Sequence, residues 1–235
     1  MIKQSVYIVI PVFNEEKYLP AFIKQLLQQV KKLGDIHRII FINDGSSDTT
    51  REILESTQKR HKNILVINSQ RNHGKGYSMR KGFKEAQKQK ASKIIFMDGD
   101  GQHDPVSLKK FLAQLDTYPV VFGYRILKKD APFIRKLGNR ISNFIIRNIF
   151  GIHRKGDILC GYFGMRKDVY KEISWHSNDY GVEAEISAIV GRKMIPFKEV
   201  LVRTIYHDEK KGVNMFHALR ILLRIPYLNR VHSYS

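Results

Sequence analysis

The sequence predicts an α/β fold in which helices cover both faces of a mostly parallel central sheet. Two observations predict it. Short apolar runs that are typical of buried strands alternate with amphipathic helical patterns over residues 1 to about 124. Several of these runs lead directly into polar, glycine-containing turns, where open α/β sheets bind their ligands. A chain of 235 residues is long enough to bury a substantial core in one domain.

The apolar runs place the strands along the chain. They are expected at residues 6–10, 38–42, 64–67, 93–97 and 162–165, and within 195–205. Pro11 is expected to close the first of them. Pro105 is expected to open a helix after the fourth, since proline suits the first helical turn.

Helical periodicity fills the gaps between the early strands. The first helix is expected over residues 15–33, with Asn14 as its N-cap and Gly34 at its end. The helix after the second strand is expected to be capped by Ser47 or Asp48, whose side-chain oxygens can accept from free N–H groups of the first turn.

Further helices are expected to follow the third strand and to cover much of the second half. A glycine-rich turn at residues 71–76 leads into a helix that ends near residue 89. The spacing predicts an amphipathic helix over 133–150, another near 180–191, and a basic amphipathic helix over 213–225.

The charge balance favours an anionic partner. Lysine and arginine number 41 and aspartate and glutamate number 22, which gives a formal net charge of +19. Nucleic acid, an anionic membrane surface and phosphorylated substrates are the classes that fit this charge. Cys160 is the only cysteine, so the chain has no intrachain disulfide and we expect a reducing compartment. No stretch is long enough to cross a membrane, and the apolar N-terminal run does not resemble a signal peptide.

Two carboxylates follow the fourth predicted strand directly. Asp98 and Asp100 are separated by Gly99 and followed by Gly101, and the glycines allow the backbone to approach a ligand closely. Oxygen ligands of this kind suit Mg²⁺ or Mn²⁺, with substrate phosphates completing the coordination. The alternative is a polar turn in which an aspartate only caps a helix.

A second group of side chains is expected at the same sheet edge. Asp44 follows the second strand, and Phe13 and Glu15 follow the first, so all three are expected to line a pocket beside the acids. Asp44 can accept a hydrogen bond from the N–H of a uracil or guanine ring. The turn at 71–76 has a composition suited to binding phosphate, but its spacing is neither that of a P-loop nor that of a dinucleotide fingerprint.

The order and spacing of four motifs resemble those of the family 2 glycosyltransferases, closest to the dolichyl- or polyprenyl-phosphate sugar synthases of the dolichol-phosphate mannose synthase type. The motifs are Ile10-Pro11-Val12-Phe13-Asn14-Glu15-Glu16, Asn43-Asp44-Gly45-Ser46-Ser47-Asp48, Asn72-x-Gly74-x-Gly76 and Met97-Asp98-Gly99-Asp100-Gly101-Gln102-His103. The second half resembles the family in outline, through Gly123-Tyr124-Arg125, Arg135-x-Leu137-Gly138-Asn139-Arg140 and Asp157-x-x-Cys160-Gly161.

The resemblance implies a GT-A fold, a GDP- or UDP-linked sugar donor, a Mg²⁺ or Mn²⁺ cofactor at an Asp-x-Asp motif, and inversion at the sugar carbon. It implies that the metal ligands are Asp98, Asp100 and Gln102. It implies that the donor-binding residues are Pro11, Phe13, Glu15, Asp44, Lys75 and Asp98. It places Arg125 with the two acids in catalysis, and it assigns the acceptor phosphate to Arg125, Arg135 and Arg140.

We therefore expect a single glycosyltransferase domain over residues 1–235. It would comprise a nucleotide-sugar half at 1–124, an acceptor half at 125–212 and an amphipathic helix at 213–228. The expected location is the cytoplasm, on the cytoplasmic face of a membrane. The C-terminal helix suits an in-plane anchor, and the alternative is a helix packed on the core with a solvated basic face.

The leading hypothesis is sugar transfer to a polyprenyl or dolichyl phosphate, and the alternative is transfer to a hydroxyl group of a glycan or glycolipid. A hydroxyl acceptor needs a general base, whereas a phosphate is already ionised and needs cations. The candidate bases are Asp157, Asp179, Glu183 and Glu185, and the last two are expected on different faces of one helix. A non-catalytic nucleic-acid-binding protein is a remote third hypothesis, which rests on charge alone.

Overall fold

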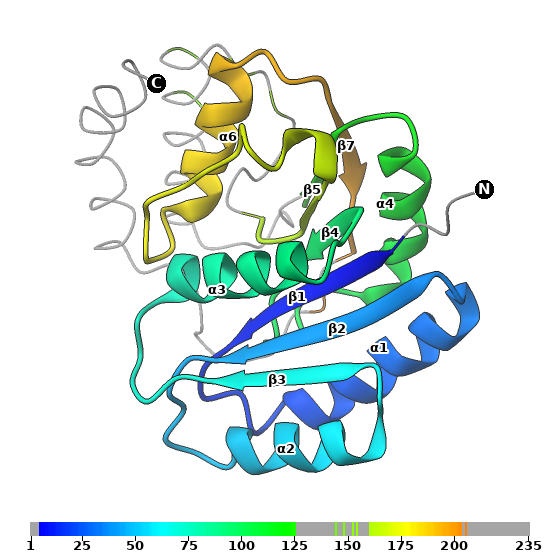
Figure 1. The fold of residues 1–235 in the computed structure, drawn as a ribbon, viewed down its shortest axis with the longest axis vertical. Coiled ribbons are helices and arrows are strands. Elements are labelled where there is room, and N and C mark those ends of the chain that lie inside the picture. The colour runs from blue at the N-terminus through cyan, green and yellow to red at the C-terminus, as the bar shows by residue number, and fades with distance from the viewer. Residues whose placement is uncertain are drawn as a thin grey trace.

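A seven-stranded sheet runs through the computed structural model, which describes residues 5–125, 144, 148, 152, 154, 160–203 and 205. Its strands are β1 (Val6–Val12), β2 (Ile36–Asn43), β3 (Ile64–Asn68), β4 (Lys93–Phe96), β5 (Val120–Tyr124), β6 (Phe163–Arg166) and β7 (Phe197–Leu201). They lie in the order β3-β2-β1-β4-β6-β5-β7 (Figure 1). Each predicted strand is present, with its ends shifted by a few residues.

Helices cover both faces of this sheet, as the alternating pattern predicts. They are α1 (Leu19–Leu33), α2 (Thr50–Arg60), α3 (Lys75–Lys88), α4 (Leu108–Leu115) and α6 (Val182–Arg192). The apolar sides of α1, α2 and α4 share one core with strand residues such as Ile8 and Ile10. The apolar sides of α3 and α6 share the other core with Tyr7 and Val9, because successive side chains of a strand point to opposite faces (Figure 1).

The sheet is mixed, because one strand in its middle runs backwards. β1 pairs in parallel with β2 and β4, β2 pairs in parallel with β3, and β5 pairs in parallel with β7. β6 lies between β4 and β5 and is antiparallel to both. The sheet and the helices on its two faces confirm the predicted fold class, and the reversed β6 is a feature that the apolar pattern did not reveal.

β1 does not end at Pro11 but continues to Val12, which corrects the prediction. The carbonyl of Val9 accepts from Met97 N at 3.2 Å on the β4 side, and the carbonyl of Val12 accepts from Asp44 N at 2.9 Å on the β2 side. Pro11 lies two residues after Val9 and therefore also faces the β4 side, where β4 has already ended at Phe96. The missing N–H thus costs no ladder hydrogen bond.

The first helix begins at Leu19 rather than at residue 15, and Asn14 is not its N-cap. Asn14 has a φ of 53°, a left-handed conformation that asparagine tolerates better than most residues. Its Oδ1 accepts from Ser47 N at 2.9 Å, so it ties the end of β1 to the turn after β2. Gly34 ends the helix at a φ of 70°, as predicted.

Two other predicted helix starts lie close to their predicted positions. The N-cap residue of α2 is Thr49, one residue after the predicted Asp48. Asp48 Oδ1 accepts from Thr50 N at 3.0 Å at the start of α2. Pro105 opens a short 3₁₀ turn over Pro105–Ser107 that leads into α4. The predicted helix near 180–191 is α6. The helices expected over 133–150 and 213–228 lie outside the described residues, apart from positions 144 and 148.

Within the described part of the chain, every helix is too short or too polar to cross a bilayer.

The start of α3 is fixed by close packing of the helix on the sheet. Gly82, in the middle of α3, faces Val9 so closely that a Cβ there would clash with a Val9 methyl group. This contact brings the helix axis near β1 and thereby sets where the first turn of α3 lies relative to the ends of the strands.

Gly82→Ala is expected to lower the free energy of unfolding by about 1–3 kcal/mol, because overpacking outweighs the gain in helix propensity. Urea unfolding followed by circular dichroism would measure it. Ser56→Ala, at an exposed position of α2, is the control and should change stability by less than about 0.5 kcal/mol. A Gly82→Ala protein as stable as the parent would show that the helix does not pack this tightly.

Candidate active site

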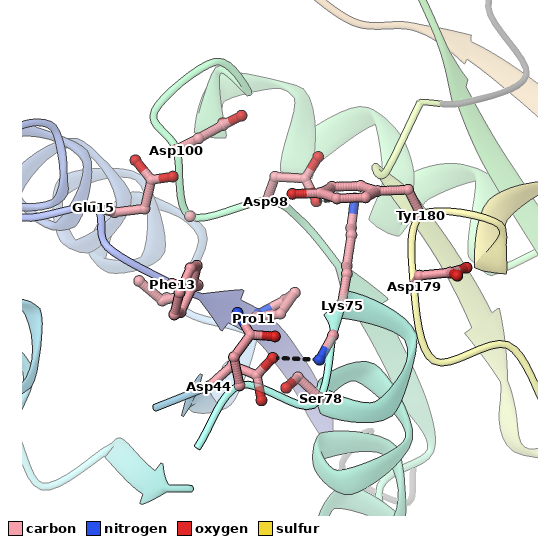
Figure 2. Close-up of a pocket in the computed structure, with 14 residues that line it drawn as sticks. Pro11, Phe13, Glu15, Asp44, Lys75, Ser78, Asp98, Asp100, Asp179 and Tyr180 are labelled. Carbon is pink, nitrogen blue, oxygen red and sulfur yellow. Dashed lines mark hydrogen bonds and ion pairs between the residues drawn. The ribbon is translucent and has the colours of Figure 1, made fainter. Parts of the chain in front are cut away.

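A cavity of about 300 Å³ opens at the carboxyl ends of β1, β2 and β4 (Figure 2). This is the sheet edge at which the sequence predicts a site. The lining residues are Pro11, Val12, Phe13, Glu15, Asp44, Asn72, Gly74, Lys75, Ser78, Asp98, Gly99, Asp100, Asp179 and Tyr180. Every residue assigned to the donor by the resemblance is among them, and so are both acids of the Asp-x-Asp motif.

Asp98 lies two residues beyond β4 and is surrounded by positive charge. Lys75 Nζ lies 2.5 Å from its Oδ1, and its backbone N–H donates to His103 Nδ1 at 3.2 Å. Burial by itself would raise the pKa of Asp98. Lys75 above all, with His103 and Arg125, outweighs burial and lowers that pKa to about 2. Asp98 is therefore ionised at every pH at which the protein would work.

Asp100 has the opposite electrostatic environment. Burial raises its pKa, and the neighbouring charge of Asp98 raises it further. Its Oδ1 accepts from Gln102 N at 2.9 Å, which fixes the carboxylate at the rim of the cavity. Two carboxylates that line one cavity and repel each other form a site that a cation would stabilise.

The donor set fits a hard divalent cation. Asp98 and Asp100 offer carboxylate oxygens, and no group of three or more histidine, cysteine, aspartate or glutamate side chains that could hold a metal occurs among the described residues. Mg²⁺ is commonly bound by one or two carboxylates together with substrate phosphates and water. The two acids therefore suit a metal that arrives with a phosphorylated substrate.

Gln102, the third predicted metal ligand, lies beside the acid pair. It is not among the residues that line the cavity. Its backbone N–H donates to Asp100, and its backbone carbonyl accepts from Ile205 N at 3.0 Å. The structure thus shows Gln102 orienting a predicted metal ligand through its main chain.

Arg125, at the end of β5, is buried next to the acid pair. Its positive charge opposes the effect of burial on the pKa of both Asp98 and Asp100. The structure therefore brings together the three residues predicted to be catalytic. Arg135 and Arg140, which were assigned to the acceptor phosphate with Arg125, lie outside the described residues.

The other end of the cavity carries the residues predicted to hold a nucleoside. Phe13 is 42% exposed and presents its ring beside Pro11 and Asp44 (Figure 2). Asp44 is buried, and its two oxygens accept from His73 N at 3.1 Å and from Gly74 N at 2.7 Å. Asp44 thus fixes the turn before α3, in addition to any contact that it makes with a ligand.

The glycine-rich turn has a packing role that the sequence reading missed. A Cβ on Gly74 would clash with the carbonyl of Asn178, and one on Gly76 would clash with the carbonyl of Ser177. The segment before α6 is held there by two further contacts, since Trp175 Nε1 donates to Gly76 O at 3.0 Å and Arg80 donates to Ser177 O at 2.6 Å. Gly74 and Gly76 thus allow the first turn of α3 to pack directly against the main chain of residues 177–178.

This docked segment supplies site residues that the sequence did not assign to the donor. Asp179 and Tyr180 line the cavity, and Glu183 Oε1 lies 2.5 Å from Lys75 Nζ. Figure 2 shows the Tyr180 side chain beside Asp98. Burial raises the pKa of Tyr180. Asp179 and Glu183 were considered only as candidate bases, because nothing local links residue 183 to residue 75.

Glu185 lies two residues after Glu183 on α6 and contacts different groups. Its two oxygens accept from His176 N at 2.9 Å and from Ser177 N at 2.8 Å, so it shapes the docked segment. The prediction that the two glutamates do not act as a pair is confirmed.

A family model described as Glycosyl transferase family 2 matches residues 7–174, which include the whole Asp-x-Asp site. The chain belongs to the family 2 glycosyltransferases. An uncharacterized protein of Methanocaldococcus jannaschii is 32% identical over 214 residues, covering 86% of this chain and 88% of that protein. The undecaprenyl-phosphate 4-deoxy-4-formamido-L-arabinose transferase of Pectobacterium atrosepticum is 33% identical over 150 residues, covering 63% of this chain and 45% of that enzyme.

Among solved structures, the glucosyl-3-phosphoglycerate synthase of Mycobacterium tuberculosis with Mn²⁺, uridine diphosphate and phosphoglyceric acid superposes with a TM-score of 0.75 at 14% identity. The match covers 96% of this chain and 78% of that one. At this identity the likeness shows the fold, and it confirms the GT-A architecture expected of a family 2 glycosyltransferase.

Asp44→Asn tests the structural role of Asp44. An asparagine keeps one acceptor oxygen but turns an NH₂ group toward the second backbone N–H, so the free energy of unfolding should fall by about 1–3 kcal/mol. Urea unfolding would measure the change. Asp35→Asn, at an exposed position before β2, is the matched control and should be neutral. Equal stability of the two variants would contradict the two hydrogen bonds to the turn.

Proposed function

We propose that this glycosyltransferase moves a sugar from a GDP- or UDP-linked donor to a polyprenyl or dolichyl phosphate, with inversion at the sugar carbon and with Mg²⁺ or Mn²⁺ as cofactor. The observation that carries the proposal is the meeting of Asp98 and Asp100 at one cavity, with the charge of the buried Arg125 acting on both carboxylates from behind the lining residues. The acids suit the metal of a diphosphate donor, and the arginine suits an anionic acceptor.

The nucleoside would lie at the Phe13 end of the cavity, with the diphosphate toward the acids. Pro11, Phe13 and Asp44 would hold the base and ribose, and Glu15 lines the same end. Asp98 and Asp100, with the main chain of Gln102 behind them, would hold the metal. When bound, the metal supplies stabilisation of the negative charge that develops on the leaving nucleoside diphosphate.

Arg125 would place the acceptor phosphate opposite the leaving group, assisted by Arg135 and Arg140. A phosphate monoester is largely dianionic at neutral pH, so its oxygen can attack without a base to deprotonate it. Charge-assisted hydrogen bonds from guanidinium groups can orient such an acceptor geometrically. The relative named as an undecaprenyl-phosphate transferase supports an acceptor of this class.

The choice of donor nucleotide stays open between GDP and UDP. The synthase of similar fold was solved with uridine diphosphate and Mn²⁺, which supports UDP and a divalent metal at 14% identity. The lipid acceptor implies work at the cytoplasmic face of a membrane, and the net charge of +19 supports an anionic surface as partner. The helix expected at 213–228 would be the anchor in that arrangement.

A hydroxyl acceptor is the second candidate, and one observation favours it. Glu183 is 4% exposed and lies at the acid site, where a general base would be needed. Burial raises the pKa of Glu183 by more than the charge of Lys75 lowers it. The ion pair nevertheless argues against this role, because an oxygen in contact with an ammonium group is not free to accept a proton from a hydroxyl. The reaction with a phosphate acceptor requires no such group.

Mass spectrometry of the product would decide between the two functions. The full chain would be incubated with Mn²⁺, a panel of GDP- and UDP-sugars, and either a short polyprenyl phosphate or the corresponding polyprenol. We expect a product whose mass is that of the phosphate plus one sugar residue, and none from the alcohol. A product from the alcohol alone would overturn the proposal in favour of the hydroxyl acceptor.

Asp100→Asn is expected to fold normally, because the side chain is nearly isosteric and keeps its oxygen for Gln102 N. Turnover should fall by about 100-fold or more, the equivalent of roughly 3 kcal/mol in the barrier, because a charged metal ligand is lost. Steady-state kinetics across a range of Mn²⁺ concentrations would measure it. Full activity of the variant at limiting Mn²⁺ would count against the metal assignment.

Arg125→Gln is expected to raise the KM for polyprenyl phosphate by about 10-fold or more, since a charge-assisted hydrogen bond to the acceptor is lost. Binding of the nucleotide sugar, measured by calorimetry without acceptor, should change much less. Arg51→Gln, at an exposed position of α2, is the control and should leave both values unchanged. An acceptor KM unaffected by Arg125→Gln would contradict its role.

A further inference from the structure

One ammonium group joins three elements at the acid site. Lys75 Nζ lies 2.5 Å from Asp98 Oδ1 and 2.5 Å from Glu183 Oε1. Lys75 is the first residue of α3, Glu183 is the second residue of α6, and Asp98 follows β4. The side chains are 13%, 4% and 22% exposed, so the cluster is largely withdrawn from water.

The surrounding backbone keeps this cluster compact. A Cβ on Gly161 would lie 2.5 Å from both carboxylate oxygens of Asp98 and from Lys75 Nζ. The main chain at Gly161 therefore packs directly against the ion pair. Lys75 is held in contact with a carboxylate that the proposed function assigns to a divalent metal.

An ammonium group and a divalent cation at one carboxylate compete for the same negative charge. They also repel each other, and the repulsion is strong where water is largely excluded. If a metal is to bind Asp98, the hold of Lys75 on that carboxylate must weaken, and its charge then needs another partner close by. Glu183 is that partner, because it already contacts the same nitrogen.

We propose that Lys75 stands in for the metal on Asp98 when no metal is bound, and that Glu183 is a positioning residue that retains Lys75 in the site when the metal takes Asp98. This inference rests on the metal site of the proposed function. Retained at Glu183, Lys75 stays beside the cavity as a fixed cation for the phosphates of the donor. Glu183 thus acts on the reaction through Lys75 and not as a base.

The contrast with Glu185 supports this role for Glu183. Glu185 is also buried, and it uses both oxygens on backbone N–H groups, as a carboxylate with a structural role does. Glu183 instead contacts a cation that lines the cavity. A buried ion pair contributes little net stability compared with apolar residues of the same volume, so stability alone is a weak reason for placing one here.

Calorimetric titration of the nucleotide-free full chain with Mn²⁺ tests the proposal without measuring activity. Lys75→Met should raise the affinity for Mn²⁺ by about 3- to 10-fold, because the competing cation is gone. Glu183→Gln should lower it by a similar factor, because Lys75 is left with Asp98 alone. Lys88→Met, at the exposed far end of α3, and Glu52→Gln, on the surface of α2, are matched controls and should match the parent chain.

The opposite signs distinguish this role from a structural one, which would make both variants bind Mn²⁺ less well or leave binding unchanged. An affinity that is unchanged or lowered in Lys75→Met would overturn the proposal. Should Lys75→Met fail to fold, because Glu183 is left buried without its cation, the double variant Lys75→Met with Glu183→Gln replaces it. The double variant should bind Mn²⁺ more tightly than Glu183→Gln alone, and an equal or weaker affinity would overturn the proposal.

The titration also separates this inference from the function on which it rests. A parent chain that binds no Mn²⁺, either alone or with a nucleoside diphosphate present, would overturn both. A parent chain that binds Mn²⁺, with variants that do not differ in the predicted directions, would overturn the role of Lys75 and Glu183 alone.

Discussion

The position of the Lys75 ammonium between Asp98 and Glu183 is the interaction on which the rest of the site depends. A charge that is taken out of water costs several kcal/mol unless an opposite charge meets it. Here each of the three partners comes from a different element of the fold. Satisfying these charges therefore requires the ends of β4, α3 and α6 to converge, and that convergence forms one wall of the cavity.

The same convergence explains why main chain packs against main chain at the first turn of α3. Gly74 and Gly76 allow the main chain of residues 177–178 to approach the first turn of α3. Arg80 then holds this segment through the Ser177 carbonyl, and Glu185 holds it through two backbone N–H groups. Asp179 and Tyr180, which follow directly, are thereby carried to the cavity. A segment that belongs to the second half of the chain becomes part of a site built mainly from the first half.

The sequence predicted the part of the site that sheet topology determines. Parallel strands bring their carboxyl ends to one edge, so Asp44 after β2 and Asp98 after β4 meet regardless of how the rest of the chain folds. The position of the Glu183 side chain could not be predicted in this way. Its place depends on how α6 packs on α3, and that follows from the antiparallel β6 and from contacts far apart in sequence. The packing role of the turn at residues 71–76 was not predicted for a related reason, because a glycine needed for close backbone packing and a glycine needed for phosphate look alike in a sequence.

Local rules failed at the two places where a long-range contact outweighed them. Asn14 has the composition of an N-cap, yet its side chain bonds across to Ser47, and the helix starts at Leu19 instead. Pro11 resembles the end of a strand, yet β1 continues because the neighbouring strand on that side is shorter. Both exceptions lie at the rim of the cavity, where β1 and the turn after β2 must be held together to present Phe13 and Asp44.

The distribution of charge in the cavity suits a transfer between two phosphates better than a transfer to a neutral group. Asp98 and Asp100 alone would repel a diphosphate, so a donor can enter only with compensating cations. Lys75 and Arg125 supply two such charges from the protein itself, and both act on Asp98. A divalent metal brought with the donor would supply the rest and would leave Arg125 to face the acceptor. A neutral hydroxyl acceptor would gain nothing from a buried arginine at that position and would need a free base, which the ion pair of Glu183 with Lys75 does not provide.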